Sequence, residues 1–426
     1  MTEIKNETYN FSLHIPHQKS MRFLRYRQFT LERDIISIAY SVFNIEKLLK
    51  QGHDISRLVL TMDNSTYRNI NVNALKKELE DLLIQVLFNK TEVIINNKNL
   101  TKNKKRKKIQ FETSKNVCLF SGGIDSFSGI FNAKQYFKDV KGVFIAHSDQ
   151  QGVINITNKI INNVLVPNQI GCETIYAPSI GSEGYSQTRG FLYFLSASIY
   201  LNIFDSSNLL ITECGSTMYQ PRFSPYDEVT MTTHPIIMNK VKKIIEIMLN
   251  RKINIITPFE NLTKAEVISN SPIKKYIPNT HSCISQRFRE HDGTCFGCVI
   301  RKIGTICADI QDVSYSNDPF INNSANIDNL LSLMRFNFDI ITNYNKMPFF
   351  SKENIFLFDK LDLFKRYSLD TYSALYLLEK NGEPLASRIE GLLTQMKKIL
   401  GEEKLIKRIK NIRENRIKPN FNNIVK

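Results

Sequence analysis

The sequence predicts an α/β protein: a parallel sheet with helices on both faces, an N-terminal α+β extension and a helical C-terminal region. Three observations carry this prediction. Strand and helix patterns alternate in the middle of the chain, a mixed pattern precedes them, and helical spacing follows them. A chain of 426 residues has room for two to three domains, and we place the boundaries at residues 1–110, 111–310 and 311–426.

The first region predicts a small α+β unit without a chemical motif. Its strand-like runs and helical stretches are Asn10–Ile15, Arg57–Met62, Glu92–Asn96, Leu31–Leu49 and Val72–Leu87. A basic run without apolar residues, Lys102–Lys108, follows this unit. This run is either a solvated linker or hairpin tip, or a contact for phosphate or nucleic acid.

The middle region predicts a parallel sheet built from βαβ units. Short apolar runs predict strands at Val117–Phe120, Gly142–Ala146, Glu173–Ala177, Leu209–Glu213 and Ile253–Pro258. Helical stretches lie between them at Phe127–Lys138, Val153–Val164, Thr188–Ile203 and Pro235–Leu249. Regular alternation of this kind implies right-handed crossovers and helices on both faces of the sheet. Ligands of such sheets bind at the carboxyl ends of the strands, so the loops after the runs are candidate sites.

The last hundred residues read as helical. The segment Lys397–Lys418 is strongly basic, and Leu405, Ile409 and Ile412 within it share one helical face. We expect an amphipathic helix with a cationic side, packed at the end of the fold.

Composition limits the class of protein. Apolar residues make up 42% and charged residues 23%, which excludes a collagen-like or largely disordered chain. Lys and Arg number 57 against 41 Asp and Glu, a net charge of +16. Such an excess attracts phosphates, nucleic acid or acidic partners, although a coding bias toward Asn, Ile and Lys produces the same excess.

The expected location is the reducing cytoplasm. No secretory signal is visible at the start of the sequence. The most apolar stretch, Gly190–Phe204, is too short for a bilayer and reads as a buried helix, so we expect no membrane contact. The seven cysteines are odd in number, which argues against a disulfide framework.

The strongest chemical signal is the segment Ser121–Ser126, which lies between an apolar run and a helix. Gly122 and Gly123 let the backbone turn and approach an anion, and the amides at the helix start then point at that anion. The serine hydroxyls add donors, and Asp125 holds either the loop or Mg²⁺. The pattern differs from a Walker A loop. The expected phosphate-binding residues are Ser121, Gly122, Gly123, Ile124, Asp125 and Ser126.

Three cysteines form a second candidate site. Cys295 and Cys298 make a Cys-x-x-Cys pair, and Cys283 lies upstream. Close thiolates with glycine between them suit a tetrahedral zinc site, with a redox pair or buried structural thiols as alternatives.

Further candidates follow the predicted strands. Gln150 lies in a polar turn, and the guanidinium group of Arg189 can form bidentate hydrogen bonds with a phosphate. Glu213 can accept two hydrogen bonds from the edge of a guanine-like base, with Gly215 beside it, and Lys264 can neutralise phosphates. The alternatives are a polar loop without a role for Gln150, a surface residue for Arg189 and Lys264, and a solvated strand end for Glu213. We interpret two histidines, at positions 147 and 234, as structural.

The segment Ser121-Gly122-Gly123-x-Asp125-Ser126 after a strand resembles the pyrophosphate loop of the PP-loop ATP pyrophosphatases. That resemblance implies the HUP-like fold of the adenine nucleotide α hydrolase-like proteins. It also implies a reaction in which ATP is cut between its α and β phosphates. A substrate oxygen becomes adenylated, and an amine or sulfur nucleophile then displaces AMP. Ser121, Asp125, Ser126 and Lys264 would be catalytic, while Gln150 and Arg189 would help to bind the nucleotide.

Two further motifs resemble the QueC family of 7-cyano-7-deazaguanine synthases. These are Cys295-x-x-Cys298-Val-Ile-Arg301 and Pro258–Val267, the second with a Thr-Lys-x-Glu core. The family shows four cysteines, three of them in one Cys-x-x-Cys-x-x-Cys run, whose first position here is Asp292. The fourth zinc ligand is therefore His291 as first choice and Asp292 as second, while Cys307 is expected in the core.

The resemblance implies an ATP-dependent C–N ligase that needs Mg²⁺ and Zn²⁺ and adenylates 7-carboxy-7-deazaguanine or a similar carboxylate. In its length, and in having the regions 1–110 and 311–426 beside the middle region, this chain resembles the QueC-like proteins of bacterial anti-phage defence operons of the Qat type. The nitrogen nucleophile would then be an amine of a partner protein from the same operon. The alternatives are a housekeeping enzyme using ammonia, a PP-loop enzyme modifying tRNA or DNA, and a scaffold that binds ATP without turnover.

Overall fold

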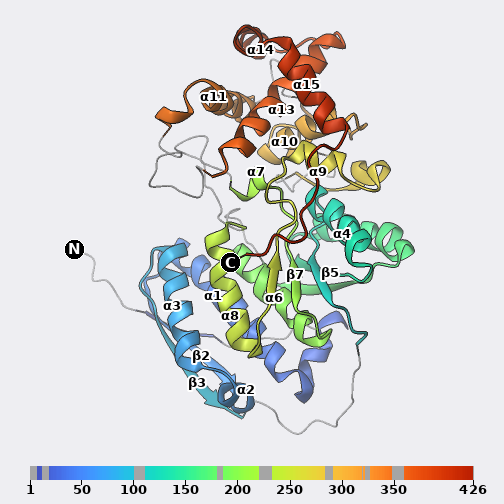
Figure 1. Cartoon of the computed structure of the whole chain (residues 1–426). Coiled ribbons are helices and arrows are strands. Elements are labelled where there is room, and N and C mark those ends of the chain that lie inside the picture. The colour runs from blue at the N-terminus through green and yellow to red at the C-terminus, as the bar shows by residue number, and fades with distance from the viewer. Residues whose placement is uncertain are drawn as a thin grey trace, which may run out of the picture.

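A computed structural model describes residues 7–11, 19–99, 111–179, 186–219, 233–283, 291–318, 320–321, 327–347 and 359–425. The protein is an α/β protein with one five-stranded and one three-stranded parallel sheet and a helical C-terminal region (Figure 1). The basic run Lys102–Lys108 lies outside the described residues. In the described part, no helix is both long enough and apolar enough to cross a membrane.

The five-stranded sheet confirms the predicted alternation. Its strands are β4 (Asn116–Leu119), β5 (Lys141–His147), β6 (Cys172–Ala177), β7 (Asn208–Leu210) and β8 (Asn254–Ile256). They pair in the order β6-β5-β4-β7-β8, and every pairing is parallel. The chain thus builds outward on one side of β4 and then returns to the other side. Open parallel sheets bind ligands at such a reversal, which here lies at the carboxyl ends of the neighbouring strands β4 and β7.

Four helices connect these strands as predicted. They are α4 (Ile124–Phe137), α5 (Gln151–Ile160), α6 (Arg189–Ile203) and α8 (Pro235–Leu249). One turn of π-helix, Ile161–Leu165, extends α5. Helices α6 and α8 pack together on one face of the sheet, and right-handed crossovers put α4 and α5 on the other (Figure 1). The apolar stretch Gly190–Phe204 is the buried α6, as predicted.

The N-terminal unit is more regular than predicted. Its elements are β1 (Glu7–Asn10), α1 (Thr30–Lys50), β2 (Ile55–Asp63), α2 (Asn64–Asn69), α3 (Val72–Leu87) and β3 (Glu92–Lys98), with short 3-10 turns at Lys19–Arg25 and Arg27–Phe29. The expected α+β arrangement is wrong in one respect: the strands form a parallel sheet. They pair in the order β1-β2-β3, which is also their order along the chain. Parallel strands need a helix between them, which α1 and α3 supply. The first strand ends at Asn10, and most of the expected Asn10–Ile15 run lies outside the described residues.

The two sheets belong to one layered body. Helix α1 packs against α6, and α3 packs against α8. Figure 1 shows the layers from left to right as the small sheet, α1 with α3, α6 with α8, the large sheet and α4. The N-terminal unit thus covers the α6–α8 face of the large sheet.

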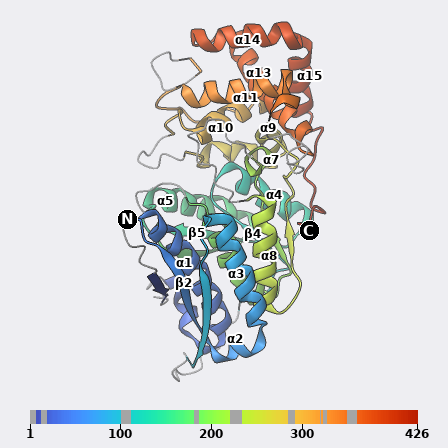
Figure 2. The same cartoon turned by 90° about the vertical axis from the view of Figure 1, so that its left-hand side faces the viewer.

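The remaining helices lie above the carboxyl ends of the large sheet's strands (Figure 2). They are α7 (Gly215–Met218), α9 (Lys264–Ser269), α10 (Phe296–Ala308), α11 (Asp328–Thr342), α13 (Leu361–Lys380), α14 (Ser387–Leu400) and α15 (Glu402–Arg413), with 3-10 turns at Lys274–Asn279 and Tyr344–Lys346. The predicted amphipathic helix is α15, whose Leu405, Ile409 and Ile412 are buried. After it the chain returns to the sheet, where the Val425 amide donates to the Ile255 carbonyl at 2.9 Å.

One cation of α15 is buried rather than solvated. Arg408 is 5% exposed and pairs with Asp370 of α13 at 2.6 Å and with Glu266 of α9 at 2.7 Å. Glu266 also pairs with Arg366 of α13. This network joins three helices, so the C-terminal helices are fastened to α9.

We predict that Arg408→Leu lowers the free energy of unfolding by about 3–5 kcal/mol, because it leaves the buried carboxylate of Asp370 without its cation and leaves Glu266 with Arg366 alone. Urea unfolding followed by circular dichroism measures the change. The exposed neighbour Lys407→Leu is the matched control and should change stability by less than about 0.5 kcal/mol. Equal effects of the two substitutions would contradict the assignment.

Candidate functional site

The loop after β4 has the backbone that a phosphate loop requires. Gly122 has a φ of +77°, and a Cβ there would lie 2.6 Å from Thr157 Oγ1. At Gly123 a Cβ would lie 3.2 Å from the carbonyl oxygen of His281. The first glycine is therefore required by both conformation and space, and the second lets another chain segment approach closely.

The two serines of the loop hold it in shape. The Ser126 hydroxyl accepts the Ser121 amide at 3.1 Å, lies 3.0 Å from the Ser121 hydroxyl and donates to the Gly123 carbonyl at 3.1 Å. No side chain of the described residues caps α4, whose N-cap is Gly123. The amides of its first turn, beginning at Ile124, are therefore available to an anion, and the helix dipole adds to the attraction.

An ion pair fixes the helix that follows the loop. Asp125 of α4 is 6% exposed, and its Oδ2 accepts from the Lys264 ammonium at 2.5 Å and from the Cys214 amide at 3.2 Å. Lys264 is the first residue of α9, where Thr263 and Glu266 form a capping box. Although burial opposes a charged lysine, the carboxylate of Asp125 raises the pKa of Lys264. The structure thus brings together two predicted site residues that lie 139 positions apart.

Glu213 lies at the same place, after β7. Burial, and then the negative charge of Asp125, raise the pKa of Glu213 to about 8. Ligand atoms of Asp125, Glu213 and Cys214 lie within 4.8 Å of one another, so this group can hold a metal ion. Oδ1 of Asp125 is buried and accepts no hydrogen bond in the described part of the chain, and either a protonated Glu213 beside it or a cation would satisfy it.

Gly215, expected beside a substrate, has a packing role in the structure. Its amide donates to the carbonyls of Phe259 and Leu262, at 3.0 and 2.9 Å. A Cβ at this position would lie 1.9 Å from the carbonyl oxygen of Glu260. Its amide is therefore used within the fold, and only glycine allows α7 to approach this turn.

Gln150 and Arg189 lie beside the ends of the next strands. Gln150 is the N-cap residue of α5, after β5, and Arg189 is the first residue of α6, after β6. His147, at the end of β5, is buried between the Pro178 carbonyl and the Tyr193 hydroxyl, and burial lowers the pKa of His147 to about 4. His147 thus has partners within the fold, and the other histidine interpreted as structural caps α8.

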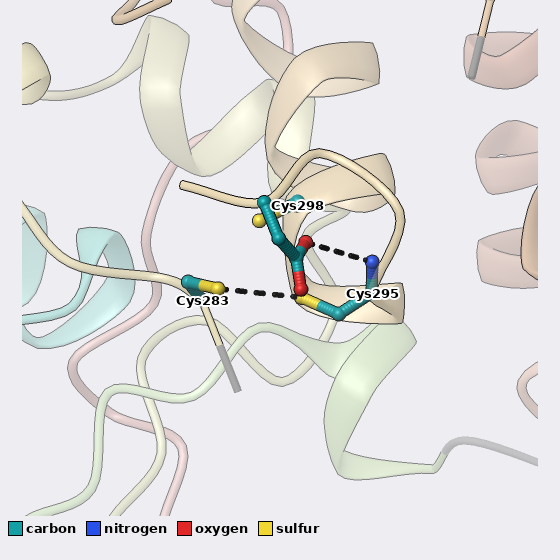
Figure 3. A group of neighbouring side chains, drawn as sticks. Cys283, Cys295 and Cys298 are labelled. Carbon is teal, nitrogen blue, oxygen red and sulfur yellow. Dashed lines mark hydrogen bonds between the residues drawn. The ribbon is translucent and has the colours of Figure 1, made fainter. Parts of the chain in front are cut away.

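The three cysteines converge, as Figure 3 shows. The Sγ atoms of Cys283 and Cys295 are 3.9 Å apart, and Cys298 points at both from the first turn of α10. Asp292 completes the group, whose ligand atoms all lie within 4.8 Å of one another. Sulfur atoms at the corners of a zinc tetrahedron are about 3.8 Å apart, so this donor set fits zinc. Hydrogen bonds from Cys295 and Cys298 lower the pKa of Cys283, which favours a thiolate.

The structure favours the second choice of fourth ligand. Oδ1 of Asp292 accepts the amides of Thr294 and Cys295, at 2.9 and 3.0 Å, and this turn directs the carboxylate into the group. The first choice, His291, is not a member of the group that the structure brings together. Its Nε2 instead accepts the Ser282 amide at 3.2 Å. Cys307 is buried in α10, as expected.

One chain segment links the two sites. The His281 amide donates to the Gly122 carbonyl at 3.0 Å, and Cys283 stands two residues further on. Arg301, which is 1% exposed, pairs with Asp312 and donates to the carbonyl of Thr280 at 2.8 Å. The motif that ends in Arg301 does not by itself predict these contacts. The spacing of Arg301 three residues from Cys298, which puts it on the same face of α10, was the available signal.

No model of a known protein family matches this chain.

We predict that Asp292→Ala weakens zinc binding by at least about tenfold, because it removes a ligand, whereas His291→Gln retains the metal. Competition with a chromophoric chelator measures the affinity, and elemental analysis measures the zinc content of the purified protein. Loss of zinc in His291→Gln with retention in Asp292→Ala would reverse the assignment.

We predict that Glu213 makes the protein less stable as pH rises. The folded protein keeps this proton up to about pH 8, whereas an unfolded chain releases it near the ordinary value of 4.5, so stability falls across this window. Without nucleotide or Mg²⁺, the wild-type Tm should fall from pH 5 to pH 8 by at least about 2 °C more than that of Glu213→Gln. The exposed Glu403→Gln should keep the wild-type slope; identical slopes in all three proteins would contradict the assignment.

Proposed function

We propose that this protein is an ATP-dependent enzyme that adenylates a carboxylate and passes the acyl group to a nitrogen nucleophile. Its fold would then be the HUP-like fold of the PP-loop ATP pyrophosphatases. The observation that carries the proposal is the Ser121–Ser126 loop after β4, with a positive φ at Gly122 and the Lys264–Asp125 pair beneath it. This loop follows β4 at the point where the strand order reverses, which is where open parallel sheets bind ligands.

The geometry supports diphosphate as the leaving group. Amides at the start of α4 would bind its oxygens, and Lys264 would neutralise charge that develops as the bond to the α-phosphorus breaks. Asp125 and Glu213 would hold Mg²⁺ through carboxylate oxygens, as this ion prefers, and the ion would supply further charge neutralisation.

The reaction balances in two steps. A carboxylate oxygen attacks the α-phosphorus of ATP, and diphosphate leaves with the bonding electron pair. The nitrogen of an amine then attacks the acyl carbon, AMP leaves, and the nitrogen loses a proton to give an amide. The protein's contribution is to hold the acid in line with the α-phosphate and to stabilise the departing charge.

The substrate and the acceptor rest on the resemblance to the QueC family. We propose 7-carboxy-7-deazaguanine or a similar acid as the substrate, and an amine of a partner protein of an anti-phage defence system as the acceptor. The Cys283–Asp292–Cys295–Cys298 group, two residues from the loop contact of His281, is consistent with the zinc site of that family. The zinc would be structural and would fix the segment that touches the loop.

A second candidate is favoured by the charge. A net charge of +16 suits a PP-loop enzyme that modifies tRNA or DNA. Salt-dependent binding of tRNA or duplex DNA by the purified protein would favour this alternative.

The test is release of pyrophosphate from ATP in the presence of the deazaguanine acid, with mass spectrometry of added amines and partner proteins. We predict that Gly122→Ala lowers the rate by about 10²–10³-fold, because a Cβ strains the positive φ and collides with Thr157. Gly171→Ala is the matched control, because a Cβ there meets no atom within 4 Å. A wild-type protein that releases no pyrophosphate with any tested acid and nucleophile would refute the proposal.

A further inference from the structure

A carboxylate of the N-terminal unit holds the backbone that leads into α6. Glu46 of α1 is 3% exposed and accepts four hydrogen bonds. They come from the hydroxyls of Ser186 and Thr188, at 2.7 and 2.6 Å, and from the amides of Gln187 and Thr188, at 2.7 and 2.9 Å. A single buried anion thus fixes three consecutive residues of another part of the chain.

This anion also lies at the start of a helix. Thr188 is the N-cap residue of α6, and Arg189 is its first residue. A negative charge at a helix N-terminus stabilises it, and here the four bonds fix its position as well. Glu46 therefore fixes the position of the backbone from which the Arg189 side chain extends.

The next residue of α1, Lys47, contacts the other end of the connection from β6 to α6. The Lys47 ammonium donates to the carbonyl of Ser179 at 2.9 Å, just after β6. The Tyr40 hydroxyl donates to the carbonyl of Tyr176, within β6. Helix α1 therefore contacts the connection from β6 to α6 on both the strand side and the helix side.

Two cations lie near this point, because Lys47 and Arg189 are the chain neighbours of Glu46 and Thr188, which are hydrogen-bonded to each other. Lys47 and Arg189 both act electrostatically on the ring of His147, as does Asp149. The carboxylate of Asp149 already accepts the Ser179 hydroxyl at 2.7 Å. Because His147 is buried and uncharged at neutral pH, and Lys50 pairs with Glu46 at 3.2 Å, the local charge is three cations (Lys47, Lys50 and Arg189) against the two carboxylates of Asp149 and Glu46. The ring of Phe43, in α1, packs on the His147 ring, with 5.6 Å between the ring centroids. This contact keeps α1 against the end of β5.

This cluster stands at the same edge of the sheet as the phosphate loop. Strand β5 is the direct parallel neighbour of β4, and β6 is the neighbour of β5, so their carboxyl ends point the same way. A ligand held at the end of β4 can therefore extend over the ends of β5 and β6.

We propose that Lys47 and Arg189 together bind an anionic group of a substrate at the carboxyl ends of β5 and β6, with Glu46 as a positioning residue for Arg189. The N-terminal unit thus supplies part of the site. The inference rests on the proposed function, because the anion is either a phosphate of ATP or the carboxylate of the acid. A guanidinium group and an ammonium group suit both kinds of oxygen anion.

The test measures the two ligands separately on the full chain. Isothermal titration gives the Kd of a non-hydrolysable ATP analogue, and steady-state kinetics give kcat and the KM for the acid. Lys47→Ala should weaken one of these ligands by about tenfold, with kcat changed by less than about threefold. The weakened ligand identifies the source of the anion: ATP for a phosphate, the acid for a carboxylate.

Two further variants separate binding from folding. Lys47→Arg should restore affinity, because it keeps the charge. Glu46→Gln should weaken the same ligand as Lys47→Ala and accelerate amide hydrogen exchange at Gln187 and Thr188. Lys77→Ala, an exposed lysine of α3 in the same unit, is the matched control and should change neither ligand.

The possible results separate a failure of this inference from a failure of the proposed function. If wild-type protein binds ATP and releases pyrophosphate but Lys47→Ala matches it for both ligands, only the inference fails. If wild-type protein binds neither ligand, both fail. If Lys47→Ala lowers the Tm and kcat while both affinities stay unchanged, Lys47 has a purely structural role and the inference is overturned.

Discussion

The buried ion pair between Asp125 and Lys264 is the constraint on which the rest of the site depends. It joins the first turn of α4, at the end of β4, to the first residue of α9, in the helical region above the sheet. A buried pair is stable only when both partners are present, so neither the loop nor α9 can shift alone. From α9, Glu266 continues the connection through Arg408 to α15 and α13. The Ser121–Ser126 loop and the C-terminal helices thus form one mechanical unit.

Two other parts of the chain fix the edges of this unit. The segment that carries Cys283 approaches from one direction, where the His281 amide bonds to the carbonyl of Gly122. Helix α1 approaches the ends of β5 and β6, where Glu46 and Lys47 hold the entry to α6. Helix α1 and the segment that carries Cys283 therefore both reach the carboxyl edge of the large sheet. They position loops that a bare parallel sheet would leave unsupported.

Local patterns were sufficient for most of the fold, because the strands of the large sheet alternate with helices along the sequence. The need for glycine at position 122 could be predicted for the same reason, since its positive φ is a local requirement. Contacts between residues that lie far apart in the sequence could not be predicted from local patterns. Arg408 reads as one more cation on a basic helix, and its burial depends on Asp370 and Glu266 in other elements. The choice between His291 and Asp292 is decided by the turn after them, which no spacing rule contains.

A structure of the protein with ATP and Mg²⁺ bound tests the central claim most directly. The account predicts that the β- and γ-phosphate oxygens lie within hydrogen-bonding distance of the amides from Gly122 to Ser126, with the Lys264 ammonium beside them. A nucleotide bound elsewhere, with no phosphate at this loop, would contradict it.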